Sequence, residues 1–137
     1  MDSVWSLTLF LYRRMVECAE EVFSIVLEKY GGSEKVARYV RKWRRQIEKR
    51  GEPKSFSEIL GLTIWTYQYI IGVVGSFSIG DCFTFTSLRE EQEKGSASIK
   101  KEFFEDEKAL EAIEAFRMTC NTILSLQPVV RMIEEDN

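Results

Sequence analysis

The sequence predicts an all-α protein, folded as an antiparallel four-helix bundle, and three observations support this. Apolar residues recur at the three- and four-residue spacing of helices over most of the chain. Capping residues and glycines stand where such segments would begin and end, which keeps the connections short. No repeat, linker or low-complexity tract divides the 137 residues, so we expect one domain, residues 1–137.

The first predicted helix spans residues 2–30. Asp2 or Ser3 can cap its first amides, and the pair Gly31-Gly32 can end it by adopting left-handed conformations. Its apolar sector covers roughly 200°, whereas a surface helix needs only about 100°. This helix must therefore be covered from two sides.

The second predicted helix spans residues 34–50, with Ser33 as its N-cap, Gly51 as its C′ residue and Pro53 as a barrier to continuation. A narrow apolar stripe repeats at spacings of four, three and four residues: Val36, Val40, Trp43 and Ile47, with Tyr39 beside them. Five cations fall on the opposite side: Arg38, Arg41, Lys42, Arg45 and Lys49.

The third predicted helix opens with the capping-box pattern from Ser55 to Glu58. The twenty-two residues from Ile59 to Gly80 carry no charge, which is long enough for a membrane span. Glycines and polar residues dilute this segment, however, and its Trp and Tyr residues lie centrally rather than at its ends. We therefore expect the buried middle of a bundle and no membrane span.

Residues 76–86 allow two interpretations. Their alternation around Gly80-Asp81 is compatible with a short hairpin, but an isolated hairpin is only marginally stable in water. We favour a helix break, followed by a resumed helix that starts at the capping-box pattern from Ser87 to Glu90.

The last long helix is predicted over residues 99–126, with Ser98 as its cap. Pro128 should kink or end it and leave a final amphipathic turn or two at 129–135. Its predicted apolar stripe consists of Ile99, Phe103, Leu110, Ile113, Cys120 and Leu124.

Charge is unevenly distributed in this chain of net charge −3. Residues 33–54 hold nine Lys or Arg and three Glu, whereas the rest holds ten basic and nineteen acidic residues. The basic helix could bind phosphates, an acidic protein or the acidic part of a second copy. Because Tyr39 and Trp43 belong to the apolar stripe, and an acidic body repels phosphate, nucleic-acid binding is the alternative and not the preferred function.

No residue pattern indicates catalysis. The absence of His removes Ser-His-Asp and Cys-His nucleophile systems, HExxH zinc sites and Glu-x-x-His di-iron sites. Cys18, Cys82 and Cys120 form no CxxC pair and no secretory signal is visible, so we expect reduced, buried thiols in a cytoplasmic protein. The sequence therefore predicts a protein that is not an enzyme and that holds no cofactor.

Charged residues of the last helix fall into two groups. Glu107, Glu111 and Glu114 share one side, and without His or an EF-hand loop we interpret them as a solvated face rather than metal ligands. Asp106 and Arg117 fall within the apolar sector and are too far apart to pair along one helix. We expect each of these two to find a partner on another helix or another chain.

The composition, with no His, four Gln, two Asn and a dense mixture of Glu, Lys and Arg, resembles that of hyperthermophile proteins. In this respect and in its small size, the chain is similar to orphan proteins carried by viruses and plasmids of hyperthermophilic archaea. The resemblance is one of composition over the whole chain, and it identifies no functional residue. It implies an interaction protein.

The preferred function is a homodimeric protein–protein interaction module that acts as an adaptor or assembly factor for an unidentified protein partner. Part of the apolar sector of helix 2–30 should stay uncovered in a monomer, and exposed apolar patches mark contact surfaces. Two-fold pairing covers such a patch with its own copy. The predicted anchors line one edge of the sector: Trp5, Leu9, Tyr12, Val16 and Phe23.

Overall fold

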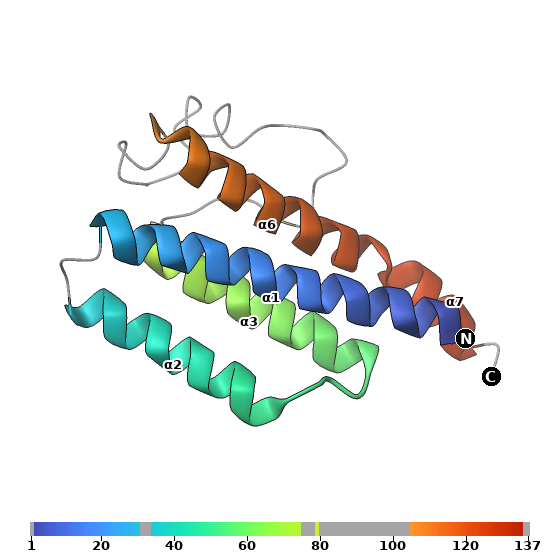
Figure 1. The fold of residues 1–137 in the computed structure, drawn as a ribbon. Helices are drawn as coiled ribbons and strands as arrows, with labels where there is room; N and C mark the ends of the chain where they lie inside the picture. Colours follow the sequence, from blue (N-terminus) through green and yellow to red (C-terminus); the bar gives the residue numbers. More distant parts are fainter. Residues whose placement is uncertain (1, 31–33, 75–78, 80–104, 136–137) are drawn as a thin grey trace.

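The computed structural model describes residues 2–30, 34–74, 79 and 105–135, and all regular structure within them is helical. The helices, in chain order, are α1 (Asp2–Tyr30), α2 (Glu34–Arg50), α3 (Phe56–Val74), α6 (Glu107–Ser125) and α7 (Gln127–Glu135). The four long helices lie side by side, and the short α7 follows α6 at the end of the molecule where α1 begins (Figure 1). The predicted all-α class is confirmed.

Helix α1 is the element against which the others pack. It contacts α6 most extensively, then α3, and to a smaller extent α2. Figure 1 shows α6 and α2 on opposite sides of it. Its residues Met15, Ala19, Val22 and Phe23 are fully buried as a result. The prediction that this helix is covered from two sides is confirmed.

Helix α3 is less central than the sequence predicted. Ile59, Leu62 and Ile70 are buried on the side that faces the core. Ile64 is exposed, however, as are Gly61 and other residues on the outer side. Its uncharged composition therefore reflects many small and polar residues rather than burial on all faces. Among the described residues, no helix combines the length and hydropathy needed to cross a membrane.

The bounds of the first three helices agree with the predicted stop and start signals. Gly51 has φ 68°, the left-handed conformation expected after the C-terminus of α2, and its N–H donates to the Ile47 carbonyl at 3.2 Å. At the start of α3, the Glu58 N–H donates to Ser55 Oγ at 3.1 Å. The Glu58 carboxylate accepts from the Lys54 N–H at 3.1 Å, one residue before the donor of a standard capping box.

The apolar stripe of α2 packs as predicted. Trp43 is buried, its ring lies 4.9 Å from that of Phe23 on α1, and its Nε1–H donates to Thr66 Oγ1 on α3 at 3.0 Å. Tyr39 stacks on Tyr69 of α3 with 4.4 Å between ring centroids. Trp43 thus joins three helices, which leaves the opposite side of α2 for its cations.

The last long helix differs from its prediction in two respects. The predicted helix 99–126 is interrupted at Asp106, so that α6 begins at Glu107: Asp106 has extended backbone (φ −84°, ψ 110°) and its carboxylate accepts from the N–H groups of Lys108 and Ala109. Residues 99–104 lie outside the described part. The core-facing residues are Ala109, Ala112, Ile113, Phe116, Arg117, Cys120 and Ile123. Leu110 and Leu124 of the predicted stripe are only half-buried.

The buried side of α6 differs from the predicted stripe because it includes two alanines that the prediction left out. Ala109 and Ala112 are buried on α6, which packs mainly on α1, and such small side chains favour close approach of two helices. Near the C-terminus, α6 ends at Ser125 and Pro128 occupies the first turn of α7, so the predicted interruption and final helical piece are confirmed. The predicted hairpin or helix break at 76–86 lies, apart from Ile79, outside the described residues.

Candidate functional site

Asp106 joins the start of α6 to the end of α1. Its carboxylate forms an ion pair with Lys29, in addition to capping α6. The Lys29 hydrogen bond, assisted by those from the capped amides, holds the pKa of Asp106 below its usual value. The prediction that Asp106 finds a partner on another helix is confirmed. Arg117 lies on the core-facing side of α6 and is buried.

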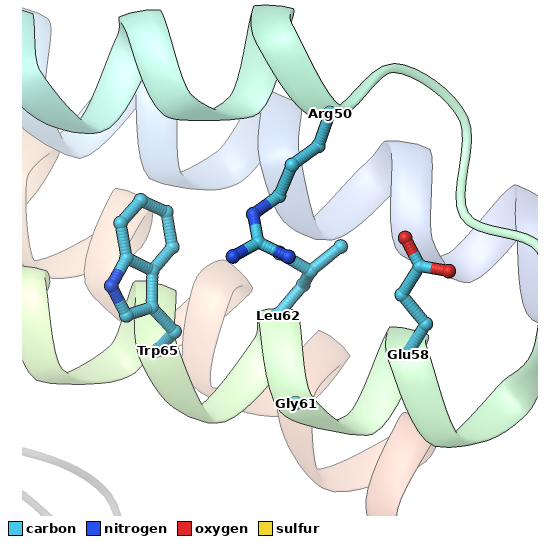
Figure 2. Close-up of a pocket in the computed structure, with 5 residues that line it drawn as sticks. All are labelled: Arg50, Glu58, Gly61, Leu62 and Trp65. Carbon is cyan, nitrogen blue, oxygen red and sulfur yellow. The ribbon is translucent and has the colours of Figure 1, made fainter.

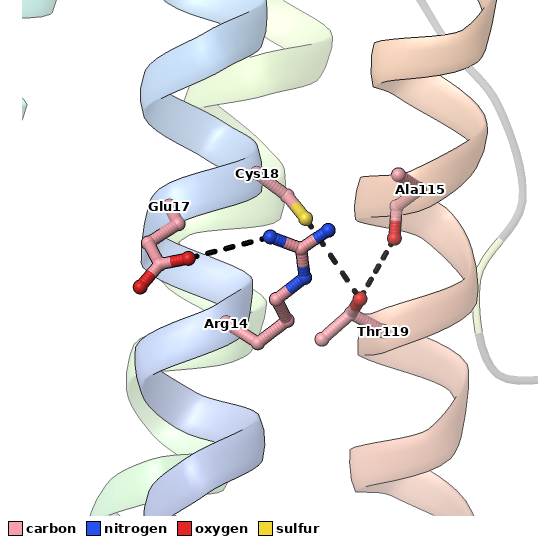
Figure 3. A network of polar contacts seen from close by, with 5 residues as sticks. All are labelled: Arg14, Glu17, Cys18, Ala115 and Thr119. Atoms are coloured by element: carbon pink, nitrogen blue, oxygen red, sulfur yellow. Dashed lines mark hydrogen bonds and ion pairs between the residues drawn. The ribbon is translucent and has the colours of Figure 1, made fainter.

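Cys18 and Cys120 are free, buried thiols between α1 and α6. The Cys18 Sγ lies 3.9 Å from Thr119 Oγ1, whose hydroxyl donates to the Ala115 carbonyl at 2.8 Å (Figure 3). The Cys18 thiol is therefore the donor to Thr119. Burial raises the pKa of both thiols, so neither is an activated nucleophile at neutral pH. The prediction of buried thiols is confirmed for these two, and Cys82 lies outside the described residues.

The five cations on the outer side of α2, which we call the basic face, are all exposed: Arg38, Arg41, Lys42, Arg45 and Lys49. None of them forms an ion pair with another described residue. Arg44, on the side that faces α1, instead pairs with Glu20 at 2.9 Å. Trp43 points into the core, so no aromatic side chain of the stripe accompanies the basic face.

Two of the five predicted contact anchors belong to the core of the single chain. Phe23 is 0% exposed and Tyr12 is 5% exposed. Phe23 packs on Trp43, so this part of the apolar sector of α1 serves packing against neighbouring helices. Tyr12 and Phe23 are therefore not available as surface anchors, which corrects the prediction for them. Trp5, Leu9 and Val16 are half-buried against the core.

Six large apolar side chains are exposed among the described residues. Ile64 lies on α3 and Met118 on α6, and the other four belong to α1 and α7, which both reach the end of the molecule where α1 begins (Figure 1). Phe10 is 62% exposed and Leu7 lies one turn before it. On α7, which occupies the same end in Figure 1, Met132 is 65% exposed and Val129 lies one turn before it. We call these four residues the apolar end patch. Sequence reasoning missed it, although each pair has the three-residue spacing of one helix side.

The acidic residues of α6 do not form a cluster. Glu107 and Glu111 are exposed and Glu114 is half-buried. Within residues 2–30, 34–74, 79 and 105–135, no three acidic or Cys side chains lie close enough together to hold a metal ion.

Comparisons of the chain with protein-family models, with curated proteins and with solved structures gave no match. No activity or partner therefore comes to this chain from a relative, and its function has to be inferred from the surfaces described above.

Proposed function

We propose that this chain is a non-enzymatic protein–protein interaction module, folded as an antiparallel four-helix bundle, that pairs with a second copy and acts as an adaptor or assembly factor. The observation that supports pairing is the apolar end patch. Leu7, Phe10, Val129 and Met132 are large apolar side chains that the described residues leave exposed at one end of the molecule. We infer that the pair on α1 and the pair on α7 form one surface, and exposed apolar patches are typical of contact surfaces.

A second copy is a suitable occupant for this patch. In two-fold pairing the same residues serve both partners, so one patch is enough for a closed dimer. Phe10 supplies an aromatic anchor and Met132 a flexible thioether that adapts to irregular gaps. This proposal keeps the pairing predicted from the sequence and moves its anchors from Tyr12 and Phe23 to the residues that remain exposed.

Light scattering after gel filtration tests the pairing. We expect twice the 16.0 kDa chain mass for the wild-type protein. The combined Leu7→Glu and Phe10→Glu substitutions should give a folded monomer, because both side chains are exposed and their replacement leaves the core intact. The matched control is Ile64→Glu, an exposed apolar position on α3 outside the patch, which should leave the dimer unchanged. A wild-type monomer at tens of micromolar would contradict the proposal.

The second candidate function is that of a nucleic-acid-binding accessory subunit, and the basic face favours it. Five exposed cations without an ion pair in the described residues are suited to contact phosphates. The aromatic residues of α2 point away from them, which removes the stacking that single-stranded nucleic acid uses. Our preferred function therefore predicts no shift of DNA or RNA in a gel at near-physiological salt. A strong, salt-sensitive shift that Arg41→Glu with Arg45→Glu abolishes would support the second function instead.

A further inference from the structure

A pocket of about 320 Å³ lies between the C-terminal end of α2 and the first turns of α3. Its lining residues are Arg50, Glu58, Gly61, Leu62 and Trp65 (Figure 2). Small-molecule sites in proteins begin at about this volume. No member of the basic face or of the apolar end patch lines it.

The apolar part of the pocket can accept a flat molecule. Trp65 is half-buried and forms one wall, and Leu62 is buried beneath the pocket. Gly61 contributes no side chain, and a Cβ added there would meet no atom within 4 Å. The glycine therefore leaves space open between the two charged residues and the indole.

The polar part of the pocket contains an arginine without a partner. In Figure 2 the Arg50 guanidinium extends between Trp65 and Glu58, and it forms no hydrogen bond or ion pair with any described residue. Two other arginines, by contrast, are paired with glutamates: Arg13 with Glu52 and Arg44 with Glu20. The Glu58 carboxylate is used in the cap of α3, where it accepts the Lys54 N–H. The planar donor fork of Arg50 remains available for a carboxylate.

A buried hydroxyl on α1 is influenced by the same two charges. The Tyr12 Oη is buried without a hydrogen-bond partner in the described part of the chain. Burial raises the pKa of Tyr12, Glu58 raises it further and Arg50 lowers it, so both pocket charges act on this phenol. The hydroxyl therefore stays protonated at neutral pH and remains a hydrogen-bond donor.

We propose that this pocket binds a small organic monocarboxylate with a flat apolar body. The carboxylate accepts two hydrogen bonds from the Arg50 guanidinium, and the apolar body packs on Trp65 and Leu62. Glu58 disfavours a second negative charge, so the site selects monoanions over dianions. The site is independent of chain pairing, because its residues are separate from the apolar end patch.

Titration of the 137-residue chain with three aromatic probes tests the ligand class. The probes are benzoate, the neutral benzamide and the dianion isophthalate, and the readout is the Trp65 indole N–H signal in NMR spectra, assigned with Trp65→Phe. We expect benzoate to shift this signal saturably, with affinity in the millimolar range that is typical of very small ligands. Benzamide and isophthalate should each bind roughly tenfold more weakly, because one lacks the charge and the other carries a charge too many. Equal shifts for benzoate and benzamide, or no saturable benzoate shift, would overturn the proposal.

Substitutions in the polar part and in the apolar part of the pocket test whether benzoate binds there. Arg50→Gln should weaken benzoate binding roughly tenfold or more, since it removes a charge-assisted pair. Arg45→Gln, at an exposed cation of the basic face, is the matched control and should leave the affinity unchanged. Gly61→Leu should abolish binding without unfolding α3, because the space beside the glycine is open. Glu58→Gln should bring isophthalate close to the benzoate affinity. Equal losses from Arg45→Gln and Arg50→Gln would indicate non-specific attraction and overturn the site.

Discussion

Two glycines of α3 differ in what a side chain would meet. A Cβ at Gly72 would lie 2.5 Å from Tyr39 Oη, and the Tyr39 ring is held by stacking on Tyr69. At Gly61 it would meet nothing within 4 Å. We expect Gly61→Ala to raise the free energy of unfolding by about 0.5–1 kcal/mol through helix propensity. Gly72→Ala should lower it by about 1 kcal/mol, because overpacking outweighs the same gain. Urea denaturation followed by circular dichroism measures both.

The Tyr39 hydroxyl provides the control for this pair. In a Tyr39→Phe background the 2.5 Å contact is absent and the nearest remaining ring atom, Cζ, lies at 3.1 Å. The cost of Gly72→Ala should therefore shrink. If Gly72→Ala stabilised the wild-type chain as much as Gly61→Ala, the close packing of Tyr39 on this glycine would be refuted.

The thiols of Cys18 and Cys120 should be unreactive in the folded protein. Both are buried, and burial raises the pKa of each, so the thiolate that reacts with disulfide reagents is scarce. In a Cys82→Ser variant, we expect modification at pH 8 to be slow in buffer and complete for two thiols in concentrated urea. Absorbance of the released aromatic thiol counts them. Rapid modification of either thiol in buffer would show that the α1–α6 contact opens readily.

At the scale of elements, the start of α6 depends on the charge of Asp106. The pKa of this carboxyl is lowered in the folded protein by the Lys29 hydrogen bond and the capped amides, so its stabilising effect is complete above the unfolded-state pKa. It is lost as the pH falls through the lower folded-state pKa, that is, below about pH 4. We expect the melting temperature of the wild-type protein to fall over this range and the Asp106→Asn protein to show a smaller fall. Thermal unfolding followed between pH 6 and pH 2 measures the difference.

Comparing wild type with Asp106→Asn at neutral pH distinguishes the contribution of the Lys29 ion pair from that of the N-cap. Asparagine is also a good N-cap, so Asp106→Asn removes the Lys29 pair and retains an acceptor for the Lys108 and Ala109 amides. Asp106→Ala removes both and should melt lower than Asp106→Asn. Identical pH profiles for wild type and Asp106→Asn would mean that this carboxylate does not contribute to the acid sensitivity.

Helix bounds were predictable from the sequence where a conformational signal stands at the boundary. Gly51, which has positive φ, and Ser55, which caps α3, are such signals. Asp106 is also a capping residue, but the apolar spacing runs through it without a phase change, so periodicity predicted a continuous helix. The α6 stripe was misplaced because Ala109 and Ala112 contribute little to a hydrophobic pattern, although both are buried in the core.

Candidate sites were predictable from the sequence only where all their residues belong to one helix. The basic face follows from the spacing within residues 34–50, and all five of its cations are exposed as predicted. The anchors on α1 depended on which helix covers which side, and α1 alone does not determine that. The pocket at Arg50 and Trp65 joins the end of one helix to the start of the next, so only the packing of α2 on α3 brings its residues together.

At the scale of the whole molecule, one hydrophobic core joins all the described helices. It includes Phe23 of α1, Trp43 of α2, Ile70 of α3, Ile113 of α6 and Val130 of α7. Loss of any long helix would expose the buried side chains of α1. We therefore infer that the helices unfold together.

The last prediction is a single cooperative transition in urea. Trp43 reports on the junction of α1, α2 and α3, whereas α6 and α7 contain no Trp and are followed by circular dichroism. In a Trp5→Phe, Trp65→Phe variant, whose fluorescence comes from Trp43 alone, we expect both probes to give the same midpoint. Helical signal lost before fluorescence would mean that α6 and α7 detach as a separate unit. If two copies pair as proposed, the common midpoint rises with protein concentration, because unfolding then includes dissociation.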